Sequence, residues 1–155
     1  MYSIKLNKTY NFDLKNTMSF GDIKTERLYE FFKDGRNASF MLEEQLVHWF
    51  TDLTRVEGNK DHDHFDSKGV LYDAKNFTKG GLKFMPSNQL GAGRKFNESV
   101  AHTKAGKLIY ICCDIIDFPK VRVIFKHGKD LIKSYPKCSI PKKDRELLFV
   151  SKHLV

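Results

Sequence analysis

Two stretches of the chain carry apolar residues at the three- and four-residue spacing of an amphipathic helix. The first covers about residues 22–34, and it is followed by Gly35, a residue type that commonly ends helices. The second runs from Phe40 to about Leu53, after polar residues that can cap a helix. Its apolar stripe is formed by Leu42, Leu46, Trp49, Phe50 and Leu53.

Shorter runs have the composition of β-strands. The stretch from Lys107 to Ile116 is almost continuously apolar, which is typical of a buried central strand. A further strand is predicted over Val121–Phe125. Val70–Tyr72 follows Ser67-Lys68-Gly69, a turn-forming sequence, and the two together predict a β-hairpin.

The remaining segments give weaker patterns. Residues 1–20 predict one or two short strands, residues 76–88 a glycine-containing loop, and residues 88–103 a helix interrupted by glycines. Residues 147–150 predict a last strand or helix. Together, the predicted helices and strands indicate an α/β (α+β) protein whose central mixed β-sheet is flanked by helices.

Length and composition fit one folded domain. The chain has 155 residues, of which 41% are hydrophobic and 13% aromatic, so it is able to bury a core. It has no apolar run long enough for a transmembrane helix and no apolar segment typical of a signal peptide near Met1. Its three cysteines include an adjacent pair and lack zinc-binding spacing, which predicts reduced thiols in an intracellular, cytoplasmic protein.

Charge is distributed unevenly. The formal net charge is +8; residues 1–103 carry 15 Lys and Arg against 14 acids, whereas residues 104–155 carry 12 against 5. An acidic site in a basic protein suits a metal facing a polyanion such as nucleic acid. A lysine-rich surface that keeps the protein in solution is an alternative explanation of the same net charges.

The acids gather in one stretch, Asp61 to Lys75, which spans the predicted hairpin. Asp73 and Lys75 are two residues apart on its second strand, so their side chains point to the same face. One interpretation is a structural ion pair. The other is chemical, because carboxylates hold Mg²⁺ and a lysine can neutralise charge on a phosphate. Upstream, Glu43 flanks the apolar stripe of the second helix.

The order of a helix with an acid, a hairpin with two aspartates and a lysine, a loop and a buried strand resembles the restriction-endonuclease-like, or PD-(D/E)XK, nuclease superfamily. The matching residues are Glu43, Asp63, Asp73 and Lys75. The local sequence looks most like that of phage Holliday-junction resolvases. The resemblance covers residues 39–115, and it divides the domain into an extension (1–38), a catalytic core (39–115) and a basic C-terminal part (116–155).

The chain departs from the family pattern at two positions. His62 stands where the family commonly has a proline, and Asp73 stands where a glutamate is commoner. Asp61 and Asp66 are alternatives to Asp63 as the first acid, and Glu44 is an alternative to Glu43.

The resemblance implies metal-dependent hydrolysis of phosphodiester bonds in DNA, by an enzyme that works as a homodimer. It implies that Mg²⁺, or Mn²⁺ as its substitute, is bound by Asp63, Asp73, Glu43 and the carbonyl of Ala74, while Lys75 orients water or stabilises charge. Contacts to DNA are expected from Lys79, Lys83, Gln89, Arg94 and Lys95.

Several alternatives stay open. The chain could be a basic nucleic-acid-binding module without catalysis, or an RNA endonuclease on the same fold. His62 and His64 could chelate zinc or iron, although no third ligand at suitable spacing is visible. Within the DNA interpretation, the enzyme could be site-specific, of the restriction or homing type, or specific for junctions.

Overall fold

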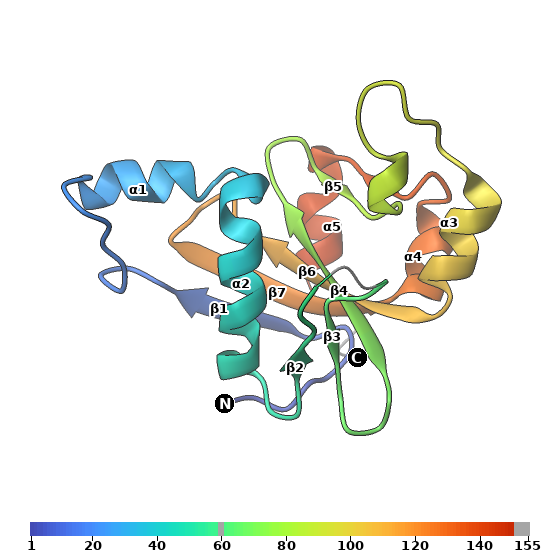
Figure 1. Cartoon of the computed structure of the whole chain (residues 1–155), viewed down its shortest axis with the longest axis horizontal. Helices are drawn as coiled ribbons and strands as arrows, with labels where there is room; N and C mark the ends of the chain where they lie inside the picture. The colour runs from blue at the N-terminus through green and yellow to red at the C-terminus, as the bar shows by residue number, and fades with distance from the viewer. Residues whose placement is uncertain (59–60, 151–155) are drawn as a thin grey trace.

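A six-stranded mixed sheet forms the centre of the computed structural model, which describes residues 1–58 and 61–150 (Figure 1). The strand order is β1-β7-β6-β4-β3-β2, and only the β4–β6 pair is parallel. The bounds are Thr9–Asp13 (β1), Thr54–Arg55 (β2), His64–Phe65 (β3), Leu71–Phe77 (β4), Leu108–Asp114 (β6) and Lys120–His127 (β7). A small second sheet pairs β5 (Leu82–Lys83) with β8 (Ser139–Ile140).

Helices cover both faces of the main sheet, which confirms the predicted α+β class with a mixed sheet (Figure 1). One face packs against α2, and the other packs against α3, α4 and α5. The helices are α1 (Thr25–Phe31), α2 (Gly35–Trp49), α3 (Glu98–Ala105), α4 (Gly128–Ser134) and α5 (Arg145–Phe149), with 3₁₀ turns η1 (Ser87–Gln89) and η2 (Lys142–Asp144).

Strand β6 is the centre of the core, because all seven of its residues are buried. Its side chains alternate between the two faces: Ile109, Ile111 and Cys113 join the α2 side, whereas Leu108, Tyr110 and Cys112 join the opposite side. A strand covered on both faces needs a continuous apolar sequence, and this run has one.

The edge strand β1 ties the N-terminal residues to this framework. Tyr10 on β1 makes edge-to-face contacts with Phe50 and Phe125, at centroid distances of 4.9 and 6.4 Å. Phe50 in turn meets Phe125 at 4.8 Å. The chain after α2 and the strands β1 and β7 therefore share one aromatic cluster.

The predicted helix boundaries are partly wrong. Gly35 does not end a helix over 22–34; it begins α2, because the Asp34 side chain accepts a hydrogen bond from Arg36 N and caps this second helix. The helix predicted over Phe40 to Leu53 thus starts earlier and ends at Trp49.

The helix predicted over residues 88–103 is also shorter. The chain forms η1 first and then a loop, and α3 starts only after Asn97, whose side chain caps Val100 N. The glycines at 91 and 93 have positive φ angles, which interrupt any helix there. The strands predicted around residues 107–116 and 121–125 are confirmed as β6 and β7, and residues 147–150 fall mostly in helix α5.

Two further expectations concern the cysteines and the membrane. Cys112, Cys113 and Cys138 are buried and unpaired, as predicted. Across residues 1–58 and 61–150, no helix has the length and apolar character needed to cross a bilayer.

Gly81 is expected to be intolerant of any side chain. Its φ is +84°, and an added Cβ would overlap the carbonyl oxygen of Ile140 on the neighbouring β8. We expect Gly81→Ala to lower the free energy of unfolding, measured in urea, by roughly 3 kcal/mol. Gly80→Ala is the matched control, because its Cβ would meet only Thr78 Oγ1 at 3.8 Å. Equal stability of the two variants would contradict this description of the turn.

Candidate active site

An acid pair, Asp63 and Asp73, lies where the β3–β4 hairpin opens. The hairpin register pairs His64 with Tyr72, which sets Asp63 opposite Asp73. The Asp63 backbone N–H donates to the carbonyl of Tyr72 (2.9 Å), and Asp63 Oδ2 accepts from the Ala74 N–H (2.9 Å). Because β3 is only two residues long, the β4 edge beyond this point has no strand partner among residues 1–58 and 61–150. The Asp63 side chain therefore replaces a backbone acceptor for the Ala74 N–H, at the end of the β3–β4 hydrogen-bond ladder.

Asp73 is buried, with only 5% of its surface exposed. Lys75 Nζ lies 3.2 Å from Asp73 Oδ2, so the two side chains share a face as their spacing predicts. Burial raises the pKa of Asp73 to about 6; the Lys75 charge opposes this rise, and the adjacent Asp63 carboxyl adds to it. The two carboxyl groups are therefore close together, with the Lys75 ammonium beside that of Asp73.

The other two aspartates of the stretch have different positions. Asp66 belongs to the hairpin turn: it accepts from the N–H groups of Lys68 and Val70 and from the Tyr72 hydroxyl. Asp61 is exposed and lies in a groove beside α3. Of the three candidates for the first acid, Asp63 is the one that adjoins Asp73.

Glu43 is buried on α2 but belongs to a neighbouring cluster. Its carboxylate lies 3.3 Å from Arg55 Nη2, and its carbonyl oxygen lies 2.8 Å from His64 Nε2. Burial raises the pKa of Glu43, and the hydrogen bond and charge of Arg55 counteract that rise. The more exposed Glu44 lies 3.7 Å from Arg55 Nη1. The structure therefore brings Asp63, Asp73 and Lys75 together and ties Glu43 to Arg55.

Two oxygen donors of the acid pair suit Mg²⁺, a hard cation that is commonly held by one or two carboxylates and completed by water and phosphate. The like-charge contribution to the raised pKa of Asp73 is the kind of repulsion that a cation relieves. The Ala74 N–H points to Asp63, and the carbonyl of an extended residue points the same way, toward the open edge. Within residues 1–58 and 61–150, no three Asp, Glu, His or Cys side chains are grouped as a metal site.

The two histidines are separated. His64 is fully buried, and its ring meets the Glu43 carbonyl, while its Nδ1 has no hydrogen-bond partner in the part of the chain that the structure describes. Burial lowers the pKa of His64, which keeps the ring neutral. His62 lines the groove beside α3 instead.

The residues expected to contact DNA fall into two groups. Lys79, Lys83 and Lys95 are exposed. Gln89 and Arg94 take part in the fold of the loop between η1 and α3: Gln89 is buried and accepts from Asn97 N (2.9 Å), and Arg94 donates to the Ser87 carbonyl (2.7 Å). A buried glutamine was not foreseeable from a loop sequence that lacks a repeating apolar pattern.

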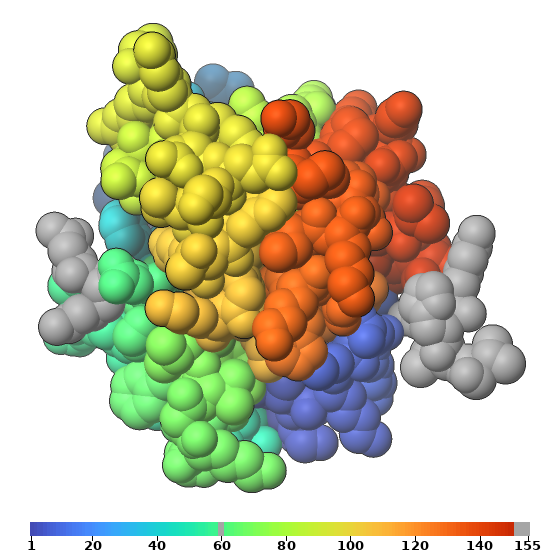
Figure 2. Space-filling model, turned by 90° about the vertical axis from the view of Figure 1, so that its right-hand side faces the viewer, coloured from blue at the N-terminus to red at the C-terminus, as the bar shows by residue number. Residues whose placement is uncertain are grey.

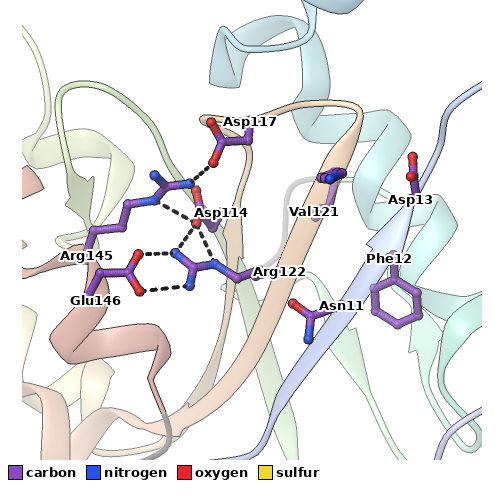
Figure 3. Close-up of a pocket in the computed structure, with 10 residues that line it drawn as sticks. Asn11, Phe12, Asp13, Asp114, Asp117, Val121, Arg122, Arg145 and Glu146 are labelled. Carbon is purple, nitrogen blue, oxygen red and sulfur yellow. Dashed lines mark hydrogen bonds and ion pairs between the residues drawn. The ribbon is translucent and has the colours of Figure 1, made fainter.

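A second polar cluster was not anticipated from the sequence. Figure 3 shows Arg122 and Arg145 converging on the buried carboxylate of Asp114, each with a nitrogen 2.8 Å from Oδ2. Arg122 also binds Glu146, and Arg145 binds Asp117 at 2.7 Å. The cluster borders a cavity of about 520 Å³. Since each guanidinium here has a carboxylate partner, the network fastens α5 to strands β6 and β7. An aspartate at the end of an otherwise apolar buried strand was the only signal for it.

No protein-family model, curated protein or solved structure matched the chain. The function of the acid pair is therefore inferred from its geometry and chemistry.

The raised pKa of Asp73 has a consequence for stability. The carboxyl binds its proton more tightly in the folded protein, with a pKa of about 6, than at its ordinary value of 3.8. Protonation thus contributes stability that is complete below about pH 3.8 and is lost as the pH rises through 6. We expect Asp73→Asn, which cannot ionise, to gain stability relative to the wild type between pH 4 and 7, on the order of 3 kcal/mol.

Urea unfolding in EDTA across this pH range measures the difference. Asp22→Asn is the control, because Asp22 is an exposed aspartate outside the site, and its stability curve should run parallel to that of the wild type. A difference between Asp73→Asn and the wild type that does not change with pH would contradict the burial of an ionisable Asp73.

Proposed function

We propose that this chain is a Mg²⁺-dependent endonuclease that hydrolyses phosphodiester bonds in DNA, on a core of the restriction-endonuclease-like type. The observation that carries the proposal is the acid pair at an open strand edge, with Lys75 Nζ 3.2 Å from the buried Asp73 carboxylate. A purely structural ion pair needs one acid for one lysine, whereas here two carboxyls adjoin. The second acid and the raised pKa of Asp73 favour a site that binds a cation.

In this proposal Asp63, Asp73 and the carbonyl of Ala74 hold Mg²⁺ or Mn²⁺. The bound ion would supply Lewis acidity, lowering the pKa of water and neutralising charge on the scissile phosphate. Lys75 neutralises further negative charge on the phosphate as the bond breaks, because its ammonium is already fixed beside Asp73. Ala74 N–H orients the Asp63 carboxylate through its hydrogen bond of 2.9 Å.

Glu43 has a supporting role in this arrangement. With Arg55 on its carboxylate and His64 on its carbonyl, it holds α2 against β2 and β3, and β3 lies between Asp63 and Asp73 in the chain. The resemblance to the nuclease superfamily also implies a direct contact of Glu43 with the metal. Its carboxylate would have to release Arg55 and reach past the sheet, because α2 packs on the face opposite to that of Asp73.

DNA is the proposed substrate because the basic residues are concentrated in one part of the chain. Residues 104–155 carry an excess of seven positive charges, and Lys79, Lys83 and Lys95 are exposed cations outside that part. Such a surface attracts the phosphate backbone. We propose a homodimer as the working form, since cutting both strands of a duplex or a junction takes two active sites.

The first test is incubation of the protein with plasmid DNA, a four-way junction and structured RNA, with Mg²⁺ or with EDTA. We expect cleavage of DNA in Mg²⁺ alone. Discrete plasmid fragments would indicate a site-specific enzyme, and preferential cutting of the junction would indicate a resolvase. Salt-sensitive binding without any cleavage would contradict the proposal and favour a binding module, whereas cleavage of RNA alone would point to a ribonuclease.

The second test removes the individual groups. We expect Asp73→Asn, Asp63→Asn and Lys75→Met each to reduce the Mg²⁺-dependent cleavage rate at least about a hundredfold, because each removes a charge that faces the reacting phosphate. The substitutions are close in size to the native residues, so circular dichroism should show an unchanged fold. Asp22→Asn is the control with the same chemical change outside the site. Full activity of the Asp73→Asn protein would exclude the mechanism.

A further inference from the structure

A groove runs between α3 and the start of the β3–β4 hairpin, with a volume of about 730 Å³. In Figure 2 the helix is drawn in yellow and lies above the green hairpin. One wall is the face of α3 that carries Ser99, Thr103 and Lys104, and the wall ends at Lys107. The groove is within the size range of small-ligand sites, roughly 300–1,000 Å³.

The lining of the groove combines apolar and cationic groups. Leu71, Leu108 and Val100 supply apolar surface, whereas Lys104 and Lys107 supply positive charge. Hydroxyl and amide groups of Ser87, Asn88, Ser99 and Thr103 complete it. This combination matches a nucleotide, which has an apolar base face, polar base edges and an anionic phosphate.

The two lysines are available to bind an anion. Among the described residues, neither Lys104 nor Lys107 forms an ion pair with a carboxylate. Arg55, Arg122 and Arg145, by contrast, are all neutralised by acids. One acid, Asp61, lies on the hairpin side of the groove, so the charge of the lining remains positive.

The groove borders the strand that carries Asp73, although Asp63, Asp73 and Lys75 are not among the residues that line it. Leu71 in its wall is two residues before Asp73 on β4, so both side chains are on the face that packs against α3. Leu71 pairs with Leu108 in the register of β4 and β6, and Asp73 pairs with Tyr110. A DNA strand that lies in the groove would thus bring a neighbouring phosphate toward Asp73.

We infer that this groove binds unpaired nucleotides of the DNA strand whose phosphate is hydrolysed at the acid pair; the inference rests on the proposed function. Duplex DNA presents its base faces to one another, and only its polar edges and phosphates reach a protein. The apolar walls formed by Leu71, Val100 and Leu108 would have no partner on such a duplex. An unpaired base can lay its face on them while Lys104 and Lys107 bind the adjacent phosphates. The substrate class is therefore DNA with a single-stranded segment next to the cut.

Binding without metal tests the groove separately from catalysis. Fluorescence anisotropy in EDTA would compare a short labelled single-stranded DNA with its duplex and with the RNA of the same sequence. We expect the single-stranded DNA to bind at least about tenfold more tightly than the duplex. The double variant Lys104→Gln/Lys107→Gln should lose that preference, and its slope of log K against log salt should be shallower by roughly 1.4, the effect of two phosphate contacts.

The matched control is Lys15→Gln/Lys24→Gln, which removes the same charge from exposed positions in the segment between β1 and α1. Helix α1 lies across the molecule from α3 (Figure 1). The control variant should retain the preference and the slope, and Lys104→Arg/Lys107→Arg should also retain tight binding. Duplex binding as tight as single-strand binding, or an equal loss in the control, would overturn the inference. Tighter binding of RNA would overturn the assignment to DNA.

Cleavage in Mg²⁺ separates the two proposals. Single-strand binding that depends on Lys104 and Lys107, without any cleavage, would support the groove as a binding site for single-stranded DNA and reject the nuclease function. Cleavage of fully paired and partly single-stranded DNA at equal rates would support the nuclease function and reject the single-strand groove.

Discussion

The burial of the Asp73 carboxyl beside Asp63 is the interaction on which the rest of this site depends. Burial disfavours the ionised form of the carboxyl and the adjacent Asp63 adds like-charge repulsion, so the pKa of Asp73 rises to about 6. Lys75 at 3.2 Å offsets only part of this effect. A protein that keeps such a pair must stabilise it through the surrounding framework, or satisfy it with a cation when it works.

The framework that holds the pair is the pairing of β4 with the fully buried β6 on one side and with the very short β3 on the other. Seven register positions fix β4 against β6. On the other edge, β3 pairs with β4 at only two positions, and Asp63 then uses its side chain to bind the Ala74 N–H. The edge beyond Asp63 is thereby opened while the first acid is held in place. The groove beside α3 is lined by Leu71, which shares a face of β4 with Asp73.

Period-two alternation was enough to predict that Asp73 and Lys75 share a face, and the continuous apolar run was enough to predict β6. The start of α2 was missed because a local hydrogen bond, from Arg36 N to Asp34, decides it rather than the apolar pattern. Contacts between segments that are distant in the chain could not be predicted from the sequence either. Arg55 binds Glu43 across twelve residues, and Arg145 binds Asp114 across thirty-one, and neither pairing has a periodic signature.

The most direct measurement of the central claim is the titration of the Asp73 side-chain carboxyl by carbon NMR, in EDTA and again with saturating Mg²⁺. A cation shared by Asp63 and Asp73 stabilises the ionised form of both. The apparent pKa of Asp73 is therefore expected to be about 6 without metal and at least about one unit lower with it. An Asp73 that titrates near its ordinary value without metal, or whose pKa does not change with Mg²⁺, would contradict a metal-binding acid pair.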